Sequence, residues 1–171
     1  MKLAFAEISQ EQSHYSLSEV SWFPADELVC CQPVLAEFEV CKKTNKTVHL
    51  KGVLRFTALL ACDRCGVPVE RRIQEEFDYI LTLEEQNNPE MSELECSTED
   101  CNTLYLKDPV IDLDMIFREQ VLLAVPARTL CAEDCQGLCS VCGVLLKNEN
   151  CYCSTSSSNS PFAVLKRLRK A

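Results

Sequence analysis

The sequence predicts an α+β fold with an antiparallel strand-rich body, one main helix and a cysteine-rich C-terminal module. Apolar residues alternate with polar ones over much of residues 33–83, one run at residues 112–125 has helical periodicity, and six of the 13 cysteines fall within residues 131–153. We therefore expect the body at residues 1–126. The cysteine-rich module, a serine linker and a basic helix should follow at residues 127–171.

The strands are predicted most clearly between Pro33 and Leu83, where apolar residues recur at every second position in successive segments. Residues 43–46 interrupt the alternation and predict a hairpin turn, and the turn at residues 62–65 should join the next two strands. The N-terminal segments at residues 2–8 and 14–20 are candidates for further strands. Together these segments predict an antiparallel meander.

Residues 84–102 contain seven acidic residues, one proline and no lysine or arginine, which predicts a solvated loop. A short candidate strand follows at residues 104–106. Asp112 is placed to cap a helix over residues 112–125, and Pro126 should end it. The apolar residues of this helix recur at helical spacing and predict its buried face: Leu113, Ile116, Phe117, Val121 and Ala124.

The formal net charge is −9, which argues against a chain that coats nucleic acid over its whole surface and favours a basic partner. The N-terminal stretch reaches Glu7 before a signal-peptide apolar segment develops, which predicts a reducing, cytoplasmic compartment. No uncharged apolar run approaches the roughly 18 residues of a membrane span. We therefore expect no membrane association.

Two cysteine pairs share the spacing Cys-x2-Cys and a glycine directly after the second cysteine, which is typical of structural zinc sites. Four thiolates close one tetrahedral Zn(II) site, so eight cysteines predict two structural sites. The first site takes two distant pairs: Cys62, Cys65, Cys131 and Cys135. The second takes neighbouring cysteines: Cys139, Cys142, Cys151 and Cys153. Eight thiolates around two Zn(II) ions would lower the formal charge to about −13.

This partition is one of several, because six clustered thiols could exchange roles between the sites. Four cysteines can also hold an iron–sulfur cluster, although the short spacings and the glycines fit a zinc knuckle at least as well. Of the five remaining cysteines, Cys96 and Cys101 lie in the predicted acidic loop and are left out of the metal sites, and Cys30, Cys31 and Cys41 are interpreted as small apolar residues of the core or surface. The zinc sites predict a C-terminal zinc-binding module whose metal contributes directly to folding.

The segment Pro161–Ala171 predicts a final helix that carries a dense basic cluster in this acidic chain. The cluster consists of Lys166, Arg167, Arg169 and Lys170. One interpretation is a solvated helix face, and the other is contact with RNA or another ribosomal partner. Near the cysteines, Arg64 and Arg128 either neutralise the anionic zinc centres or reach RNA phosphates.

No catalytic constellation is found in the sequence. His14 and His49 lie in strand-like runs without a nearby nucleophile motif, and no glycine-rich nucleotide-binding loop occurs. We therefore expect neither an enzyme nor a small-molecule substrate. The alternative from the enzyme class is a thiol oxidoreductase that uses Cys62 and Cys65, but such a pair normally opens a helix, whereas strands flank this one.

Several motifs, in order along the chain, resemble those of the YceD family. They are Cys62-Asp-Arg-Cys65, the helix from Asp112-Leu113 to Pro126, Cys135-Gln-Gly-Leu-Cys139-x2-Cys142-Gly, Cys151-x-Cys153, and Pro161-Phe162 before Leu165 and Leu168. The resemblance covers residues 62–168. Two features depart from the family pattern: Ser140 replaces a proline, and residues 144–147 replace an Asn-Leu-Asn run. Neither departure involves a candidate metal ligand.

The resemblance implies a non-enzymatic accessory factor in large ribosomal subunit biogenesis, which supports the synthesis, processing or stability of large-subunit ribosomal RNA. It implies a cytoplasmic role in bacteria or an organellar role in plants. The expected partners are ribosomal RNA or a large-subunit assembly intermediate, and the acidic body adds a basic ribosomal protein as a candidate. A zinc-dependent adaptor that binds another protein complex is the alternative that the residues leave open.

Overall fold

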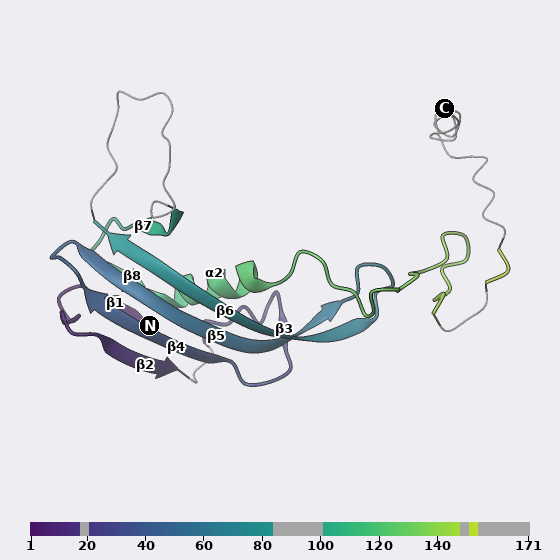
Figure 1. Ribbon diagram of the computed structural model, residues 1–171, viewed down its shortest axis with the longest axis horizontal. Coiled ribbons are helices and arrows are strands. Elements are labelled where there is room, and N and C mark those ends of the chain that lie inside the picture. Colours follow the sequence, from purple (N-terminus) through teal and green to yellow (C-terminus); the bar gives the residue numbers. More distant parts are fainter. Residues whose placement is uncertain (18–20, 84–100, 148–150, 154–171) are drawn as a thin grey trace, which may run out of the picture. The chain divides into compact units, whose positions relative to one another are not determined.

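The computed structural model describes residues 1–17, 21–83, 101–147 and 151–153 (Figure 1). Most of the predicted acidic loop, residues 84–100, lies outside these ranges. The predicted serine linker and basic C-terminal helix, residues 154–171, also lie outside them. The elements and contacts below are those of the described residues.

The chain divides into two compact units. The first, which we call the body unit, comprises Met1–Leu60 and Val69–Ala127. The second, the cysteine unit, comprises Ala61–Pro68 and Arg128–Ala171. The turn that contains Cys62 and Cys65 is therefore grouped with the C-terminal segment, although it is distant from that segment in sequence.

The main sheet has six strands in the order β2-β4-β5-β6-β7, with β3 beside β5 (Figure 1). These are β2 (Ser13–Leu17), β3 (Val29–Cys30), β4 (Leu35–Lys42), β5 (Thr47–Ala61), β6 (Pro68–Thr82) and β7 (Thr103–Tyr105). β4 lies antiparallel to both β2 and β5, while β7 pairs with β6 in parallel. The predicted succession β4, β5, β6 is confirmed, and residues 43–46 form the predicted turn between β4 and β5.

A second, two-stranded sheet pairs β1 (Lys2–Ala4) with β8 (Val110–Asp112) in antiparallel register, with Leu3 opposite Ile111. The sequence did not predict β8, because three residues are too few to show an alternation. β8 leads directly into the helix, so this small sheet ties the N-terminus to the start of that helix.

Helix α2 (Leu113–Ala124) agrees with the predicted helix. Asp112 is its N-cap and has extended backbone angles, and its Oδ1 accepts a hydrogen bond from the Met115 N–H at 3.3 Å. Val125 at the C-cap is also extended, as expected for a residue that precedes proline.

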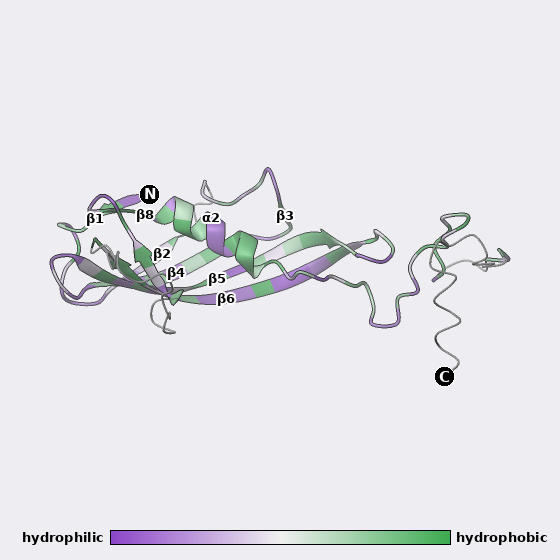
Figure 2. Cartoon of the chain, turned by 90° about the horizontal axis from the view of Figure 1, so that it is seen from above, coloured by the Kyte–Doolittle hydropathy of each residue, from purple (hydrophilic) through white to green (hydrophobic). Residues whose placement is uncertain are grey.

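The core of the body unit forms where α2 packs on one face of the sheet (Figure 1). Phe117 of α2 is fully buried. Its ring centroid lies 5.1 Å from that of Phe38, 5.3 Å from that of Trp22 and 5.8 Å from that of Phe77. Figure 2 shows β6 as mostly hydrophilic with separate hydrophobic patches, and from Arg72 to Tyr79 exposed residues alternate with buried or half-buried ones, so only one face of this part of the strand contributes to the core.

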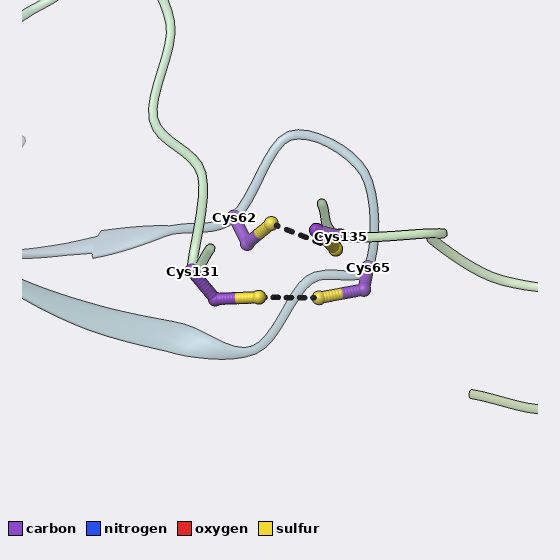
Figure 3. Close-up of side chains that lie close together, drawn as sticks. All are labelled: Cys62, Cys65, Cys131 and Cys135. Atoms are coloured by element: carbon purple, nitrogen blue, oxygen red, sulfur yellow. Dashed lines mark hydrogen bonds between the residues drawn. The ribbon is translucent and has the colours of Figure 1, made fainter. Parts of the chain in front are cut away.

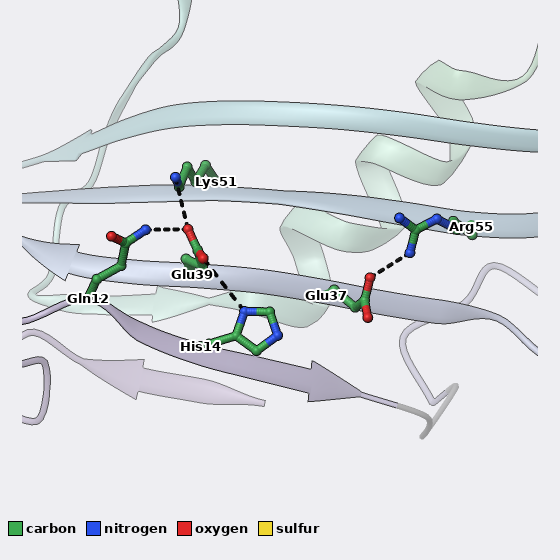
Figure 4. Close-up of polar contacts among 6 residues, drawn as sticks. All are labelled: Gln12, His14, Glu37, Glu39, Lys51 and Arg55. Carbon is green, nitrogen blue, oxygen red and sulfur yellow. Dashed lines mark hydrogen bonds and ion pairs between the residues drawn. The ribbon is translucent and has the colours of Figure 1, made fainter.

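The other face of the sheet is polar (Figure 4). Glu39 accepts from Lys51 at 2.9 Å and lies 3.7 Å from His14, while Arg55 donates to Glu37 at 2.5 Å. The hydrogen bond from Lys51 lowers the pKa of Glu39, so this carboxylate stays ionised. These cross-strand pairs show that His14 occupies an ordinary strand position.

Candidate metal centres

The eight cysteines predicted as ligands gather into two groups of four, both within the cysteine unit. The first cluster consists of Cys62, Cys65, Cys131 and Cys135. The second cluster consists of Cys139, Cys142, Cys151 and Cys153. Within each cluster all four sulfur atoms lie within 4.8 Å of one another, and all eight are free thiols. These are the same two sets that the cysteine spacing favoured.

The turn between β5 and β6 positions two thiols of the first cluster (Figure 3). Cys62 N–H donates to the Val67 carbonyl at 2.9 Å, and Gly66 N–H donates to the Cys62 carbonyl at 2.8 Å. Gly66 has φ +73°, a left-handed conformation that favours glycine. The glycine after the second cysteine therefore closes a tight turn that directs Cys62 and Cys65 to the same side.

A two-way bridge joins this turn to the C-terminal segment. Asp63 N–H donates to the Thr129 carbonyl at 2.8 Å, and Thr129 N–H donates to Asp63 Oδ2 at 2.5 Å. Thr129 is buried, so its backbone groups depend on these partners. The bridge brings the chain that carries Cys131 to the turn that carries Cys62.

Arg64 makes a second connection between the same segments. Its Nη1 donates to the Cys135 carbonyl at 2.6 Å and, at 3.4 Å, to the Glu133 carbonyl. Its own carbonyl lies so close to Gly137 that a Cβ added there would stand 2.9 Å from the oxygen. Arg64 therefore orders the backbone around Cys135.

The sulfur separations of the first cluster fit a tetrahedron around one ion. Cys62 Sγ lies 3.8 Å from Cys135 Sγ, and Cys65 Sγ lies 3.7 Å from Cys131 Sγ (Figure 3). Four sulfurs at about 2.3 Å from a central metal are about 3.8 Å apart, so the spacing leaves room for a single ion. Cys62, Cys65 and Cys135 are buried, which shields such an ion from water.

Two thiols of the first cluster differ strongly in pKa. Burial opposes ionisation of Cys62, but the backbone N–H groups of Cys131, Arg64 and Cys65 stabilise its thiolate and lower its pKa to about 6. The Cys135 thiol, together with burial, raises the pKa of Cys131 to about 12. The thiolate of Cys62 is therefore favoured at neutral pH, whereas an arriving cation must displace the proton of Cys131.

The second cluster repeats the geometry of the first turn. Gly143 N–H donates to the Cys139 carbonyl at 2.9 Å, and Gly143 has φ +73°, the same angle as Gly66. Val141 N–H points at Cys139 Sγ at 3.4 Å. The shared Cys-x2-Cys-Gly pattern thus produces the same local fold twice.

The second cluster is more open than the first, since Cys142 is exposed and only Cys139 is buried. Cys151 Sγ lies 3.2 Å from Cys139 Sγ and 3.6 Å from Cys142 Sγ. The backbone N–H groups of Cys142 and Val141 lower the pKa of Cys139 to about 6, while the Cys151 thiol raises the pKa of Cys153 to about 12. The cluster could hold one ion with a face open to solvent.

The other predicted residues lie apart from these clusters or outside the described ranges. Cys30 is half-buried against the core, Cys31 is exposed and Cys41 is half-buried, and none of the three joins a group of thiols among the described residues. The predicted RNA or partner contacts at residues 166–170 lie outside the described ranges. Sequence reasoning missed Asp63 and Thr129, because Thr129 takes part through its backbone groups, which leave no signal in the residue pattern.

The fold and the clusters define a small strand-rich protein with two candidate metal centres, each made only of cysteines. The chain belongs to the YceD family, because the family model described as "Large ribosomal RNA subunit accumulation protein YceD" matches residues 50–169. This match confirms the resemblance drawn from the sequence motifs. It also includes all eight clustered cysteines.

Two plant relatives carry the name large ribosomal RNA subunit accumulation protein YCED homolog 1, chloroplastic. The chain is 27% identical over 158 residues to the one from Arabidopsis thaliana, a match that covers 81% of this chain and 49% of the relative. It is 24% identical over 143 residues to the one from Zea mays, covering 71% of this chain and 48% of the relative.

An uncharacterised protein of Mycobacterium tuberculosis is 28% identical over 108 residues, which covers 63% of this chain and 49% of that protein. The chain thus spans about half the length of the curated relatives it matches. No solved structure is significantly similar to it. No helix within residues 1–17, 21–83, 101–147 and 151–153 has both the length and the hydropathy of a membrane span.

Proposed function

We propose that each cysteine cluster binds one structural Zn(II) ion. The observation that carries this proposal is the first cluster, where four thiols from two distant segments meet at sulfur separations suited to one tetrahedral ion. Four sulfur ligands leave no position for substrate or water, so the ions would act as cross-links. A bound ion would then stabilise the fold of the cysteine unit directly.

Elemental analysis of protein purified under reducing conditions tests this proposal. We expect about two equivalents of zinc per chain, falling to about one when Cys62 and Cys65 are both replaced by serine. Iron with visible absorbance would point instead to an iron site. Less than about 0.5 equivalents of zinc in folded protein would refute a structural role.

We propose further that the protein is a non-enzymatic accessory factor in large ribosomal subunit biogenesis, which supports the synthesis, processing or stability of large-subunit ribosomal RNA. The family description and the names of the plant relatives support this role. Free thiols at metal-site spacing suit a reducing compartment, and we propose the cytoplasm. The proposed partners are large-subunit ribosomal RNA or an assembly intermediate that contains it.

The basic residues near the C-terminus are the proposed anchor on RNA. Phosphate contacts need clustered cations, and the rest of this chain is acidic. The test measures co-sedimentation with ribosomal particles at low salt after four residues are replaced by glutamine. These residues are Lys166, Arg167, Arg169 and Lys170. We expect most of the binding to be lost. A matched variant that neutralises Lys42, Lys43, Lys46 and Lys107 removes the same charge from the body unit, outside the acidic hollow, and should bind normally.

A basic ribosomal protein is a second proposed partner, and it would bind the body unit. A hollow of about 760 Å³ there is lined by five carboxylates but only one lysine, Lys51. The carboxylates are those of Glu37, Glu39, Glu75, Glu76 and Asp78. Such a surface attracts cationic segments. Replacing Glu75 and Glu76 by glutamine should weaken binding of basic ribosomal proteins at low salt, while Glu11→Gln, a change of an exposed carboxylate outside the hollow, should not.

Two alternatives have specific support. Met115 and Leu123 on α2 are each 69% exposed, and such apolar side chains suit a zinc-dependent adaptor for another protein complex. Pull-down from ribosome-depleted extract would identify that role. The pKa of about 6 for Cys62 favours its thiolate, although the side chain is buried; a thiol oxidoreductase predicts insulin reduction that Cys62→Ser abolishes.

A further inference from the structure

One aromatic residue of the cysteine unit is almost completely open to solvent. Tyr152 is 93% exposed, whereas the next most exposed tyrosine in the described ranges, Tyr105, is 44% exposed. Among the described residues Tyr152 makes no side-chain hydrogen bond and no ring contact. Exposure of a whole aromatic ring is unfavourable in water, so a residue held this way is a candidate contact for a partner.

The backbone on both sides of Tyr152 belongs to the second cluster. Cys151 and Cys153 are its direct neighbours, and Cys153 N–H points at Cys151 Sγ at 3.4 Å. An ion held by both thiols would fix the chain between them. The ring would then stand on a rigid support and lose little conformational freedom on binding.

Val141 is presented in the same way. It lies between Cys139 and Cys142 and is 64% exposed, and Leu138 directly before the turn is 48% exposed. Each Cys-x-Cys or Cys-x2-Cys pair of the second cluster thus points its sulfurs inward and leaves an apolar side chain in solvent. The first cluster offers no such group, since Asp63 and Arg64 stand between its paired cysteines.

The charge around these residues indicates which partner would cover them. From Gly137 to Ala171 the sequence contains five basic residues and one acidic residue, Glu149, although the whole chain has a net charge of −9. Between Gly137 and Lys147 the only charged residue is Lys147 itself. Exposed apolar and aromatic side chains that a cationic segment follows in the sequence suit a polyanion that carries flat, stackable groups, which describes single-stranded nucleic acid.

We propose that the second cluster is a platform for single-stranded RNA, on which Tyr152 stacks against an unpaired base and Val141 packs beside it. This inference rests on the proposed role in ribosomal RNA metabolism and names the part of the RNA that is bound. Stacking requires a base outside a duplex, so the platform selects unpaired segments. The basic cluster at residues 166–170 supplies attraction to phosphates without regard to pairing.

The test is fluorescence anisotropy with a labelled 12-nucleotide single-stranded RNA of mixed sequence and a duplex of the same length, using the full metal-loaded chain. Tyr152→Ala should weaken binding of the single strand about tenfold, or about 1.4 kcal/mol. Tyr152→Phe keeps the ring and should stay within about twofold of the wild type. Binding of the duplex should change less than twofold in either variant.

Met115→Ala serves as the matched control, because it removes an exposed apolar side chain from α2 in the body unit and should leave RNA binding unchanged. Zinc content is measured for each variant, so a change in affinity is read only where the cluster is intact. Unchanged single-strand affinity in Tyr152→Ala, or an equal loss on the duplex, overturns the platform. The platform is also overturned if Tyr152→Ala loses a protein partner but binds RNA normally.

The experiment separates this inference from the broader function. If the wild-type chain binds neither RNA nor ribosomal particles, the proposed function fails. If the wild type binds RNA and Tyr152→Ala binds it equally well, only the stacking platform fails. If the four-glutamine variant loses RNA binding and Tyr152→Ala alone weakens single-strand binding at low salt, the proposed function and the stacking platform are both supported.

Discussion

The contact between Gly137 and Arg64 provides a graded test of how the first cluster is built. Gly137 has φ +78°, and an added Cβ would stand 2.9 Å from the Arg64 carbonyl oxygen. Gly66 has nearly the same angle, φ +73°, but a Cβ added at Gly66 would have no other atom within 4 Å. Alanine at either site is strained in the left-handed region, whereas only Gly137→Ala also collides with backbone.

The expected magnitudes follow from these two effects. The left-handed conformation costs alanine about 1–2 kcal/mol at both positions. Forcing the Arg64 backbone to move adds about 1–3 kcal/mol at Gly137. Since about 1.4 kcal/mol is a tenfold change, Gly66→Ala should lower the zinc affinity of the first cluster about 5- to 30-fold, and Gly137→Ala a further 5- to 150-fold.

Competition with a chromogenic zinc chelator measures the affinity. Both variants are made in a background in which Cys139 and Cys142 are serine, so that only the first cluster reports. Circular dichroism of the body unit's strands provides the folding control. Equal losses in the two variants, or a smaller loss in Gly137→Ala, would refute the close packing of Arg64 under Gly137.

Three further predictions concern other contacts. Asp63→Ala removes the acceptor of the buried Thr129 N–H and should lower zinc affinity of the first cluster about tenfold, whereas Asp63→Asn keeps an acceptor and should recover most of it, as measured by the same competition. Phe117→Ala leaves a cavity among three rings and should lower the free energy of unfolding by about 3–5 kcal/mol in urea titrations, with a two-state loss of the near-ultraviolet signal. Arg118 donates hydrogen bonds to both carboxylate oxygens of Asp26 and so lowers the pKa of that carboxyl below 3.8. The resulting stabilisation is present above the pKa of Asp26 in the unfolded chain and is lost as pH falls through its pKa in the folded protein. The unfolding midpoint of Arg118→Met should therefore depend less on pH below about 4 than that of the wild type.

Much of the body unit could be predicted from the sequence because its signals are local. The alternation along β4, β5 and β6 and the cap at Asp112 each involve only neighbouring residues. β3 and β8 have two and three residues, so they exist only because a partner strand lies beside them. Their positions depend on packing that no short pattern records.

Buried polar residues show the same limit. Gln120 is 6% exposed because its Nε2 donates to the Tyr79 hydroxyl at 2.6 Å. The helical pattern predicted the apolar positions around it but gave no reason to bury an amide. Only the register of α2 against β6 places the two side chains together.

The cysteine clusters were partly predictable for a different reason. Thiol counting predicts two sets of four, and the glycine after each Cys-x2-Cys pair predicts the turn, since Gly66 and Gly143 share one backbone angle. The exchange of hydrogen bonds between Asp63 and Thr129 could not be predicted, because both use a backbone group of Thr129 and backbone groups at every residue are chemically alike.

The two halves of the first cluster are translated at different times, so the cluster can form only after the second half has been made. Cys65 and Cys131 are 66 residues apart, so at about 5–20 residues per second the earlier thiols leave the ribosome roughly 3–13 seconds before their counterparts. During that interval Cys62 and Cys65 form half of a coordination shell and are exposed to oxidants and to competing cations. The four thiols can meet only after residue 135 has been translated, so a metal ion bound by all four would report that the chain has been made at least that far.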